Sequence, residues 1–255
     1  MTTQNFAASR FFLKDSVRDQ IDFSQTGQAL HKPAPPLQRE CDAAFPRISL
    51  PDGQDALNRL AKLSVAEAIT NRESVRSYSD ASLSLEELAA LLWAVQGVRR
   101  VVGPGTALRA VPSAGARHAF ETYLAISRVG GLQAGLYRFL PFEEQLAQIH
   151  LNPEIAVMAG KACRGQGCVS SAAVSFFWTA VPSRMEWRYD LAAHKAIALD
   201  AGHVSQNLYL AAEAMGIGVC AIAAYHQDKC DTLLRVDGTE EFTLYIAAAG
   251  KKKQS

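Results

Sequence analysis

Two arginines and a serine occupy alternate positions in one short segment, as Arg72, Ser74 and Arg76. An arginine presents five N–H donors in a rigid fork, and a serine hydroxyl both donates and accepts hydrogen bonds. Such a set suits an anion that also carries hydroxyl and carbonyl groups, as a phosphorylated cofactor with a ring does. Taken alone, the segment is more typical of a turn at a helix end whose arginines lie in solvent or in salt bridges.

A loop of small residues about forty positions later is the second candidate. It consists of Pro112, Ser113, Ala114 and Gly115 and leads into a predicted strand. Small residues let the backbone approach a flat ligand closely. The loop could therefore form part of a binding site for a ring.

Arg188 and Tyr189 form an adjacent pair that could act in catalysis. Arginine keeps its proton at working pH, so Arg188 is a poor candidate for proton transfer. Tyr189 could donate a proton or cover a bound ring. Packing of both side chains beneath a long helix is an equally good interpretation.

The elements that would position these residues can be read from hydrophobic spacing. Ala56, Leu57, Leu60 and Leu63 recur at helical spacing. The capping-box pattern at 64–67 predicts that a second helix starts there, and a third is predicted from Ser84 to a stop at Gly97. A long helix is predicted over 191–215, rich in small residues, and a short one over 228–234. On the long helix we interpret Asp200 and His203 as a buried hydrogen-bonded pair.

Apolar runs predict the strands. Those at 121–126, 135–139 and 145–149 predict an antiparallel meander, and the run at 172–180 predicts a central strand. Two more strands are predicted at 219–224 and 241–249. The fold class is therefore α+β, with helices packed on an antiparallel-rich sheet. Residues 1–52, rich in proline, are predicted to form an extended arm that lies over the domain formed by 53–255 or over a partner subunit.

Bulk composition excludes several function classes. A formal net charge of +1 over 255 residues argues against a nucleic-acid-binding protein. An odd number of cysteines, five, favours free thiols in a reducing compartment. Cys163 and Cys168 are too far apart in sequence for a CxxC pair, so no metal site is expected. We find no secretory signal and no apolar run long enough to span a membrane, which predicts a cytoplasmic protein.

Several segments considered together resemble the SagB-type dehydrogenase branch of the nitroreductase superfamily. The resemblance runs from about Leu63 to Gly250. It rests on the arginine–serine segment, the helix at 83–97, the loop at 112–118 and three later segments at 185–189, 199–212 and 237–241. Singly each motif is weak, and together they are specific.

The resemblance implies a nitroreductase-like fold with FMN bound non-covalently at the interface of a domain-intertwined homodimer. Arg72 and Ser74 would hold the phosphate and ribityl chain, and Arg76 would lie near the pyrimidine edge of the ring. A cation there stabilises the charge of the reduced flavin. The loop at 112–115 would approach the flavin from the partner subunit.

Two further pairs are implied by the same resemblance. Ala223 and Ala224 would offer backbone N–H groups to the flavin ring, whereas many relatives have an acidic residue followed by glycine there. Lys251 and Lys252 follow Gly250 at the place where the family often has a basic residue that reaches the phosphate. A solvated tail is the alternative for these lysines.

The leading functional hypothesis is an FMN-dependent oxidoreductase that works in two half-reactions. NADH, NADPH or an organic donor would reduce the flavin, and a small organic acceptor would then oxidise it. The first alternative is a dehydrogenase that oxidises an azoline or another intermediate on a peptide or carrier. Such relatives use an adjacent Lys-Tyr, where this chain has Arg188 and Tyr189. An alternative of another class is a non-catalytic flavin-binding scaffold subunit.

Overall fold

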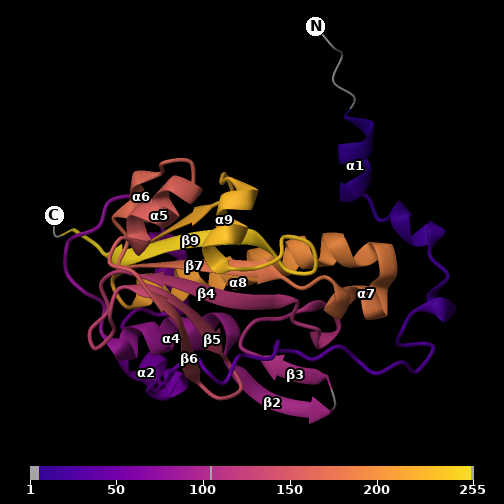
Figure 1. The fold of residues 1–255 in the computed structure, drawn as a ribbon, viewed down its shortest axis with the longest axis horizontal. Helices are drawn as coiled ribbons and strands as arrows, with labels where there is room; N and C mark the ends of the chain where they lie inside the picture. Colours follow the sequence, from indigo (N-terminus) through magenta and orange to yellow (C-terminus); the bar gives the residue numbers. More distant parts are fainter. Residues whose placement is uncertain (1–5, 104, 254–255) are drawn as a thin grey trace, which may run out of the picture.

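A seven-stranded antiparallel sheet forms the centre of the molecule (Figure 1). The computed structural model describes residues 6–103 and 105–253. In the order in which they lie side by side, the strands are β1 (Arg47–Ser49), β6 (Gln145–Leu151), β5 (Gly135–Leu140), β4 (Phe120–Ile126), β7 (Val174–Ala180), β9 (Phe242–Lys251) and β8 (Ile217–Ile222). A separate hairpin pairs β2 (Val98–Gly103) with β3 (Thr106–Arg109).

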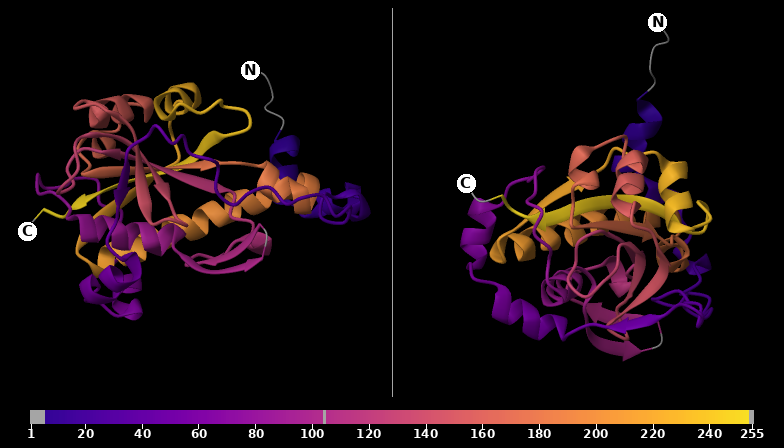
Figure 2. Two further views of the ribbon diagram at one scale, coloured as in Figure 1. Left: turned by 60° about the horizontal axis from the view of Figure 1, so that its bottom comes forward. Right: turned by 60° about the vertical axis from the view of Figure 1, so that its left-hand side comes forward.

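Helices cover both faces of this sheet (Figures 1 and 2). One face carries α5 (Ile155–Ala162), α6 (Gly167–Ser170) and α9 (Gln227–Leu234). The other carries α4 (Leu85–Gln96) and α8 (Ala193–Ala214), with α2 (Gly53–Leu60) against α4 and α3 (Val65–Asn71) against α8. Side chains alternate between the faces of a strand, so β7 sends Phe176 and Trp178 into one hydrophobic core and Phe177 into the other.

The predicted α+β fold class and antiparallel-rich sheet are confirmed. Strands β4, β5 and β6 form the predicted meander, and β7 lies centrally between β4 and β9. The predicted capping box forms between Ser64 and Glu67 at the start of α3, and the predicted helix start at Ser84 carries a second one, between Ser84 and Glu87 of α4. Each pair satisfies two backbone N–H groups that would otherwise lack partners.

The long predicted helix starts later than its apolar pattern suggested. Residues Ser183–Tyr189 form a separate helix, α7, and a short 3-10 turn at Asp190–Ala192 (η4) connects it to α8. The chain breaks between them at Asp190, whose φ of 49° lies outside the helical range. Helices α5 and α7 and the β2–β3 hairpin were not predicted.

The first half of the N-terminal arm contains helical turns, whereas an extended chain was predicted. Helix α1 (Ala7–Leu13) buries no residue and stands apart from the body (Figure 1). Two short 3-10 turns follow it, at Ser16–Gln20 (η1) and Phe23–Gln25 (η2). From Arg47 to Ser49 the arm joins the sheet of the domain, since β1 pairs with β6. The first five residues of the arm lie outside the described part, and the domain boundary at 52 and 53 stays a prediction.

Residues 35–40 of the arm, which we call the strap, are bound through their backbone. Four buried arginines of the domain, Arg109, Arg117, Arg138 and Arg184, donate hydrogen bonds to its carbonyl oxygens. The acceptors are the carbonyls of Pro35 (3.0 Å), Pro36 (2.7 Å), Leu37 (2.8 Å), Arg39 (2.5 Å) and Glu40 (3.0 Å). These bonds hold the strap on the domain.

A single buried carboxylate, Glu121, organises two of these arginines. Its side chain accepts hydrogen bonds from Arg184 and from Arg138, the latter at 2.9 and 3.1 Å. The backbone N–H of Arg39 in the strap also donates to it, at 2.8 Å. Burial alone would raise the pKa of Glu121, but Arg184 and Arg138 outweigh it and hold that pKa below its usual value. Glu121 is therefore a charged group in the folded protein.

Across the described ranges, every helix is too short or too polar to cross a lipid bilayer.

Candidate functional site

The segment that carries Arg72, Ser74 and Arg76 is anchored on the edge of the sheet. It leaves α3 at Arg72 and runs beside β8, where Ser74 bridges to Val219 and the N–H of Val75 donates to the Val219 carbonyl at 2.9 Å. The backbone bonds fix the direction of the segment. They place its side chains at the rim of the sheet.

Two glycines make room for this segment. Gly218 and Gly250 are register partners in β8 and β9. A Cβ on Gly218 would lie 2.6 Å from Val75, and one on Gly250 would lie 2.8 Å from Tyr78. The Tyr78 hydroxyl donates to the carbonyls of Val75 (2.9 Å) and Ala248 (3.0 Å). The glycines thus let the segment lie directly on the strands.

Ser74 belongs to a hydrogen-bonded chain that ends on β8. Its Oγ atom is 3.0 Å from the hydroxyl of Tyr209 in α8, and that hydroxyl accepts a 2.8 Å bond from the N–H of Ala221. When Tyr209 donates to Ser74, the Ser74 hydrogen is left for a ligand. The Arg72 guanidinium lies 5.3 Å from the centre of the Tyr209 ring, within cation–π range.

The cations near this segment divide into free and paired groups. Among the described residues, no ion pair includes Arg72 or Arg76, and Arg76 donates to the Ser74 carbonyl at 3.3 Å. Lys251 instead binds Glu87, and Lys252 binds Glu213 at 2.7 and 2.8 Å. The two arginines are therefore the cations whose charge is not already balanced by a carboxylate.

Ala223 and Ala224 lie just past the end of the β8–β9 ladder, whose last β8 residue is Ile222. Both are exposed. The Ala224 carbonyl accepts a 2.8 Å bond from Gln166. Through Ala221 this strand end is joined to Tyr209 and Ser74, so these parts of the predicted site lie on one rim.

The loop at 112–115 lies at a different place, beside the first half of α8. Ala114 opens a short 3-10 turn (η3, Ala114–Ala116), and its N–H lies 3.2 and 3.3 Å from the carboxylate oxygens of Asp200. Ser113 accepts a 2.9 Å bond from the N–H of His118. Asp200 is buried, which raises its pKa, although its hydrogen bonds act in the opposite direction.

Asp200 thus binds the loop as well as facing a histidine. The predicted Asp200–His203 pair is present at ion-pair distance, with 3.7 Å between Asp200 Oδ1 and His203 Nδ1. It differs from the prediction in two respects, because this distance is long for a hydrogen bond and His203 is exposed.

Arg188 and Tyr189 meet this loop at Gly115. A Cβ on Gly115 would lie 2.6 Å from the Tyr189 hydroxyl and 2.8 Å from Nε of Arg188. The φ of Gly115, 57°, also favours glycine. The structure therefore brings the catalytic candidates to the loop of small residues. Both are half-buried, and their backbone comes from α7.

Within one chain the arginine–serine segment and the loop at 112–115 do not come together. The arginine–serine segment is joined to Tyr209, and the loop is joined to Asp200, nine residues earlier on α8. Nine residues of α-helix rise about 14 Å and turn through about two and a half revolutions. Tyr209 and Asp200 therefore point to opposite sides of α8.

His118, at the end of the loop, gives the protein a pH dependence that can be measured. Burial, helped by the charge of Arg109, lowers the pKa of His118 to about 3. An unfolded histidine has a pKa of about 6.5, so stability is full above that pH and falls as the pH drops toward 3. We expect a loss of about 2 kcal/mol in the free energy of unfolding between pH 7 and pH 5.

Urea unfolding of the wild type and of His118→Gln at both pH values tests this expectation. Glutamine keeps an N–H donor for the Ala107 carbonyl, which His118 Nε2 contacts at 2.9 Å. The variant should lose much less stability between the two pH values than the wild type. Equal losses in both proteins would show that another group is responsible.

Sequence reasoning missed the role of Tyr209. It lies inside a segment that carried the family resemblance, but a tyrosine in a long helix is more often a core residue. Its role becomes visible only through the contact with Ala221, which is close to it in space. The described residues hold no group of three or more His, Cys, Asp or Glu side chains arranged for a metal ion.

The sequence profile described as Nitroreductase family matches residues 69–251, which include the arginine segment, the loop and Lys251. The chain belongs to the nitroreductase family. It is thus an oxidoreductase of that family, and its sheet with helices on both faces is the nitroreductase-like fold.

Individual nitroreductase relatives agree with this assignment. A protein of Methanocaldococcus jannaschii that carries the name nitroreductase is 27% identical over 205 residues, covering 80% of this chain and 96% of its own. A nitroreductase structure from Anabaena variabilis superposes with a TM-score of 0.67 at 23% identity. It covers 85% of this chain, which spans 45% of that one.

A third likeness extends over the N-terminal arm as well. The structure of the Escherichia coli microcin synthetase McbBCD complex, with truncated pro-MccB17 bound, matches 99% of this chain and 99% of its own at a TM-score of 0.59. The identity is 16%, so this likeness concerns the fold alone.

Proposed function

We propose that this nitroreductase is an FMN-dependent oxidoreductase. The observation that carries the proposal is the pair of uncompensated guanidiniums, Arg72 and Arg76, beside a serine hydroxyl fixed by Tyr209. A phosphate dianion needs such donors, and the ribityl hydroxyls suit the Ser74 hydroxyl. When bound, FMN supplies hydride and electron transfer. Titration of the purified protein with FMN tests the proposal, and a protein that takes up none would overturn it.

In this proposal the chain's own residues divide the work. Arg72 and Ser74 bind the phosphate and ribityl chain, and Arg76 balances negative charge at the pyrimidine edge of the ring. The exposed strand end at Ala223 and Ala224 offers backbone N–H groups. Lys251 and Lys252 would act on the phosphate only at long range, because each is bound to a carboxylate.

The proposal includes a homodimer in which the loop at 112–115 comes from the partner subunit. Its support is the separation of Tyr209 and Asp200 on α8 and an apolar surface beside them. Val65 and Ile69 of α3 are 71% and 58% exposed, and Leu199 of α8 is 59% exposed. A groove of about 440 Å³ lies between α2, α3, α4 and α8. Exposed apolar surface of this kind is typical of a subunit interface.

Leu199→Asp should weaken this dimer at least about 30-fold, because a charge on each subunit would be buried in the interface. Light scattering coupled to size-exclusion chromatography should then give a monomer mass, and bound flavin should be lost with it. Val101→Asp on β2, whose native side chain is 61% exposed, is the matched control. A dimer that survives Leu199→Asp with its flavin would contradict this interface.

The electron donor can be identified by stopped-flow reduction of the reconstituted protein. We expect reduction by NADH or NADPH, followed by oxidation with quinone or nitroaromatic acceptors. A flavin that no pyridine nucleotide reduces, in a protein that purifies with a stable partner, would favour a non-catalytic scaffold subunit instead.

A second candidate function is oxidation of an azoline on a peptide. The likeness to a microcin synthetase subunit over 99% of the chain favours it. Arg188 stands where azole-forming relatives have lysine, and it cannot release a proton at working pH. If the function is peptide oxidation, Tyr189→Phe should slow turnover of an azoline peptide while flavin content stays unchanged. Equal turnover would remove Tyr189 from this mechanism.

A further inference from the structure

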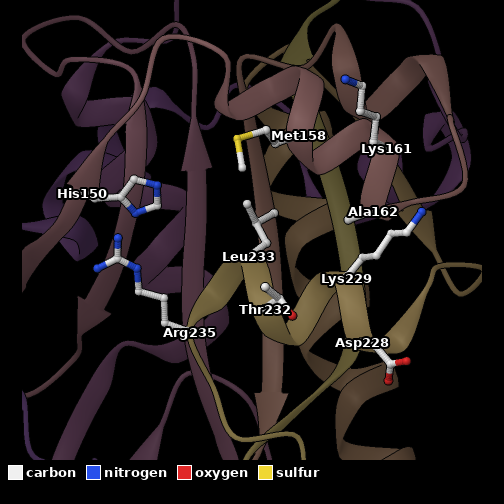
Figure 3. Close-up of a pocket in the computed structure, with 9 residues that line it drawn as sticks. All are labelled: His150, Met158, Lys161, Ala162, Asp228, Lys229, Thr232, Leu233 and Arg235. Carbon is white, nitrogen blue, oxygen red and sulfur yellow. The ribbon is translucent and has the colours of Figure 1, made fainter.

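A second groove lies on the other side of the sheet from α8. It has a volume of about 500 Å³ and is formed by α5, α9 and the end of β6, together with Arg235 just after α9 (Figure 3). None of its lining residues belongs to the arginine–serine segment, the 112–115 loop or α7. A volume of this size is within the range of small-ligand sites. The groove is thus separate from the proposed flavin site.

The floor of this groove is apolar and its flanks are cationic. Met158 and Leu233 lie in the middle, as Figure 3 shows. Arg235 and His150 lie on one side of them, and Lys161 and Lys229 lie on the other. The groove therefore has an apolar strip between two positively charged or polar sides.

These cations lack counter-charges. The ion pairs of the described chain include neither Arg235, Lys161 nor Lys229. Among the described residues that line the groove, Asp228 is the one acidic residue, and in Figure 3 its carboxylate points away from the apolar strip. Like charges around one groove repel each other, so a bound anion lowers the electrostatic energy there.

His150 adds an unsatisfied polar atom. Its Nδ1 atom is buried and has no hydrogen-bond partner among the described residues. Burial, together with the charge of Arg235, lowers the pKa of His150, so the ring is neutral at pH 7 and can donate one N–H. A buried polar atom without a partner is costly and can be satisfied by a ligand.

We propose that this groove binds an organic anion with an apolar body, such as an aromatic or aliphatic carboxylate. The apolar body lies on Met158 and Leu233. The carboxylate accepts hydrogen bonds from Arg235 and His150, and the two lysines add attraction from the other side. The ligand is bound by the combination, since an exposed lone cation contributes little by itself.

The test uses the full chain as purified and two probes, 2-naphthoate and its neutral analogue 2-naphthamide. Isothermal titration should show that naphthoate binds at least about 5-fold more tightly than the amide. Arg235→Gln and the double variant Lys161→Gln/Lys229→Gln should each weaken naphthoate binding about 3- to 5-fold, in keeping with the small contribution of exposed charge pairs. Met158→Asp should weaken it further by placing a negative charge on the floor.

Arg100→Gln removes an exposed cation on β2 and is the matched control, with no expected change. Equal affinity for the acid and the amide would overturn the proposal. So would naphthoate binding that is unchanged in both Arg235→Gln and the double lysine variant, which would place the probe elsewhere. If Arg100→Gln lost as much affinity for naphthoate as Arg235→Gln, the overall charge of the protein would explain the binding, and the proposal would also be overturned.

Discussion

The Glu121→Gln variant is expected to lose about 3–5 kcal/mol of its free energy of unfolding, the loss typical when one partner of a buried ion pair is removed. Glu121 is the carboxylate that accepts hydrogen bonds from Arg138 and Arg184, and all three side chains are buried. Glutamine keeps the shape but leaves two guanidiniums without a counter-charge. Urea unfolding at pH 7 measures the loss.

Glu143→Gln is the matched control, because Glu143 is exposed and its carboxylate accepts hydrogen bonds from the side-chain amide of Gln38, at 2.9 and 3.2 Å. Its free energy of unfolding should stay within about 0.5 kcal/mol of the wild type. The pKa of Glu121 is depressed in the fold, so its contribution is full above the unfolded pKa and is lost as the pH falls below it. A loss below 1 kcal/mol in Glu121→Gln would contradict the role given to this carboxylate.

The second large effect is expected in Arg72→Ala, whose affinity for FMN should fall about 10- to 100-fold. A hydrogen bond to a charged group is worth about 1.5–3 kcal/mol, and Arg72 is one of two cations near Ser74 whose charge is uncompensated. Fluorescence titration of the apoprotein with FMN measures the affinity. Arg72→Lys should recover only part of it, since an ammonium cannot form the two parallel bonds of a guanidinium.

Arg76→Ala provides the contrast. Its FMN affinity should be closer to that of the wild type than the affinity of Arg72→Ala is. The reduction potential of its bound flavin should be lower than in the wild type, because a cation near the pyrimidine edge stabilises the reduced form. Potentiometric titration of the two variants separates these roles. If Arg72→Ala retained flavin as well as the wild type, the assignment of the arginine–serine segment would be wrong.

Sequence patterns predicted those helices and strands that depend on residues close together in the sequence. The capping boxes at Ser64 and Ser84 depend on residues three positions apart, and both formed. The β4–β6 meander follows from apolar runs separated by short turns. Helix α7 escaped prediction because Arg184 is buried in it. A buried arginine breaks an amphipathic pattern, and only its distant partner Glu121 explains it.

In the candidate site, too, contacts between residues distant in sequence could not be predicted. Arg72, Ser74 and Arg76 could be recognised from their types and spacing, and the structure places them on one rim with the end of β8. The partners of Lys251 and Lys252 could not be recognised, since Glu87 and Glu213 are 164 and 39 residues away from them in sequence. Their pairing is the reason why these lysines are weaker candidates than the two arginines.

The strap has a practical consequence for shortened versions of the protein. Its bonds to the arginines use carbonyl oxygens, which every amino acid carries, so exchanging its side chains should disturb these bonds little. A protein that starts at Lys32 keeps every acceptor, and one that starts at Gln38 loses the carbonyls that Arg109, Arg117 and Arg184 use. Buried donors without acceptors are costly. The safe limit for N-terminal truncation is therefore set by three main-chain oxygens, and removal of helix α1, which buries no residue, is expected to leave folding intact.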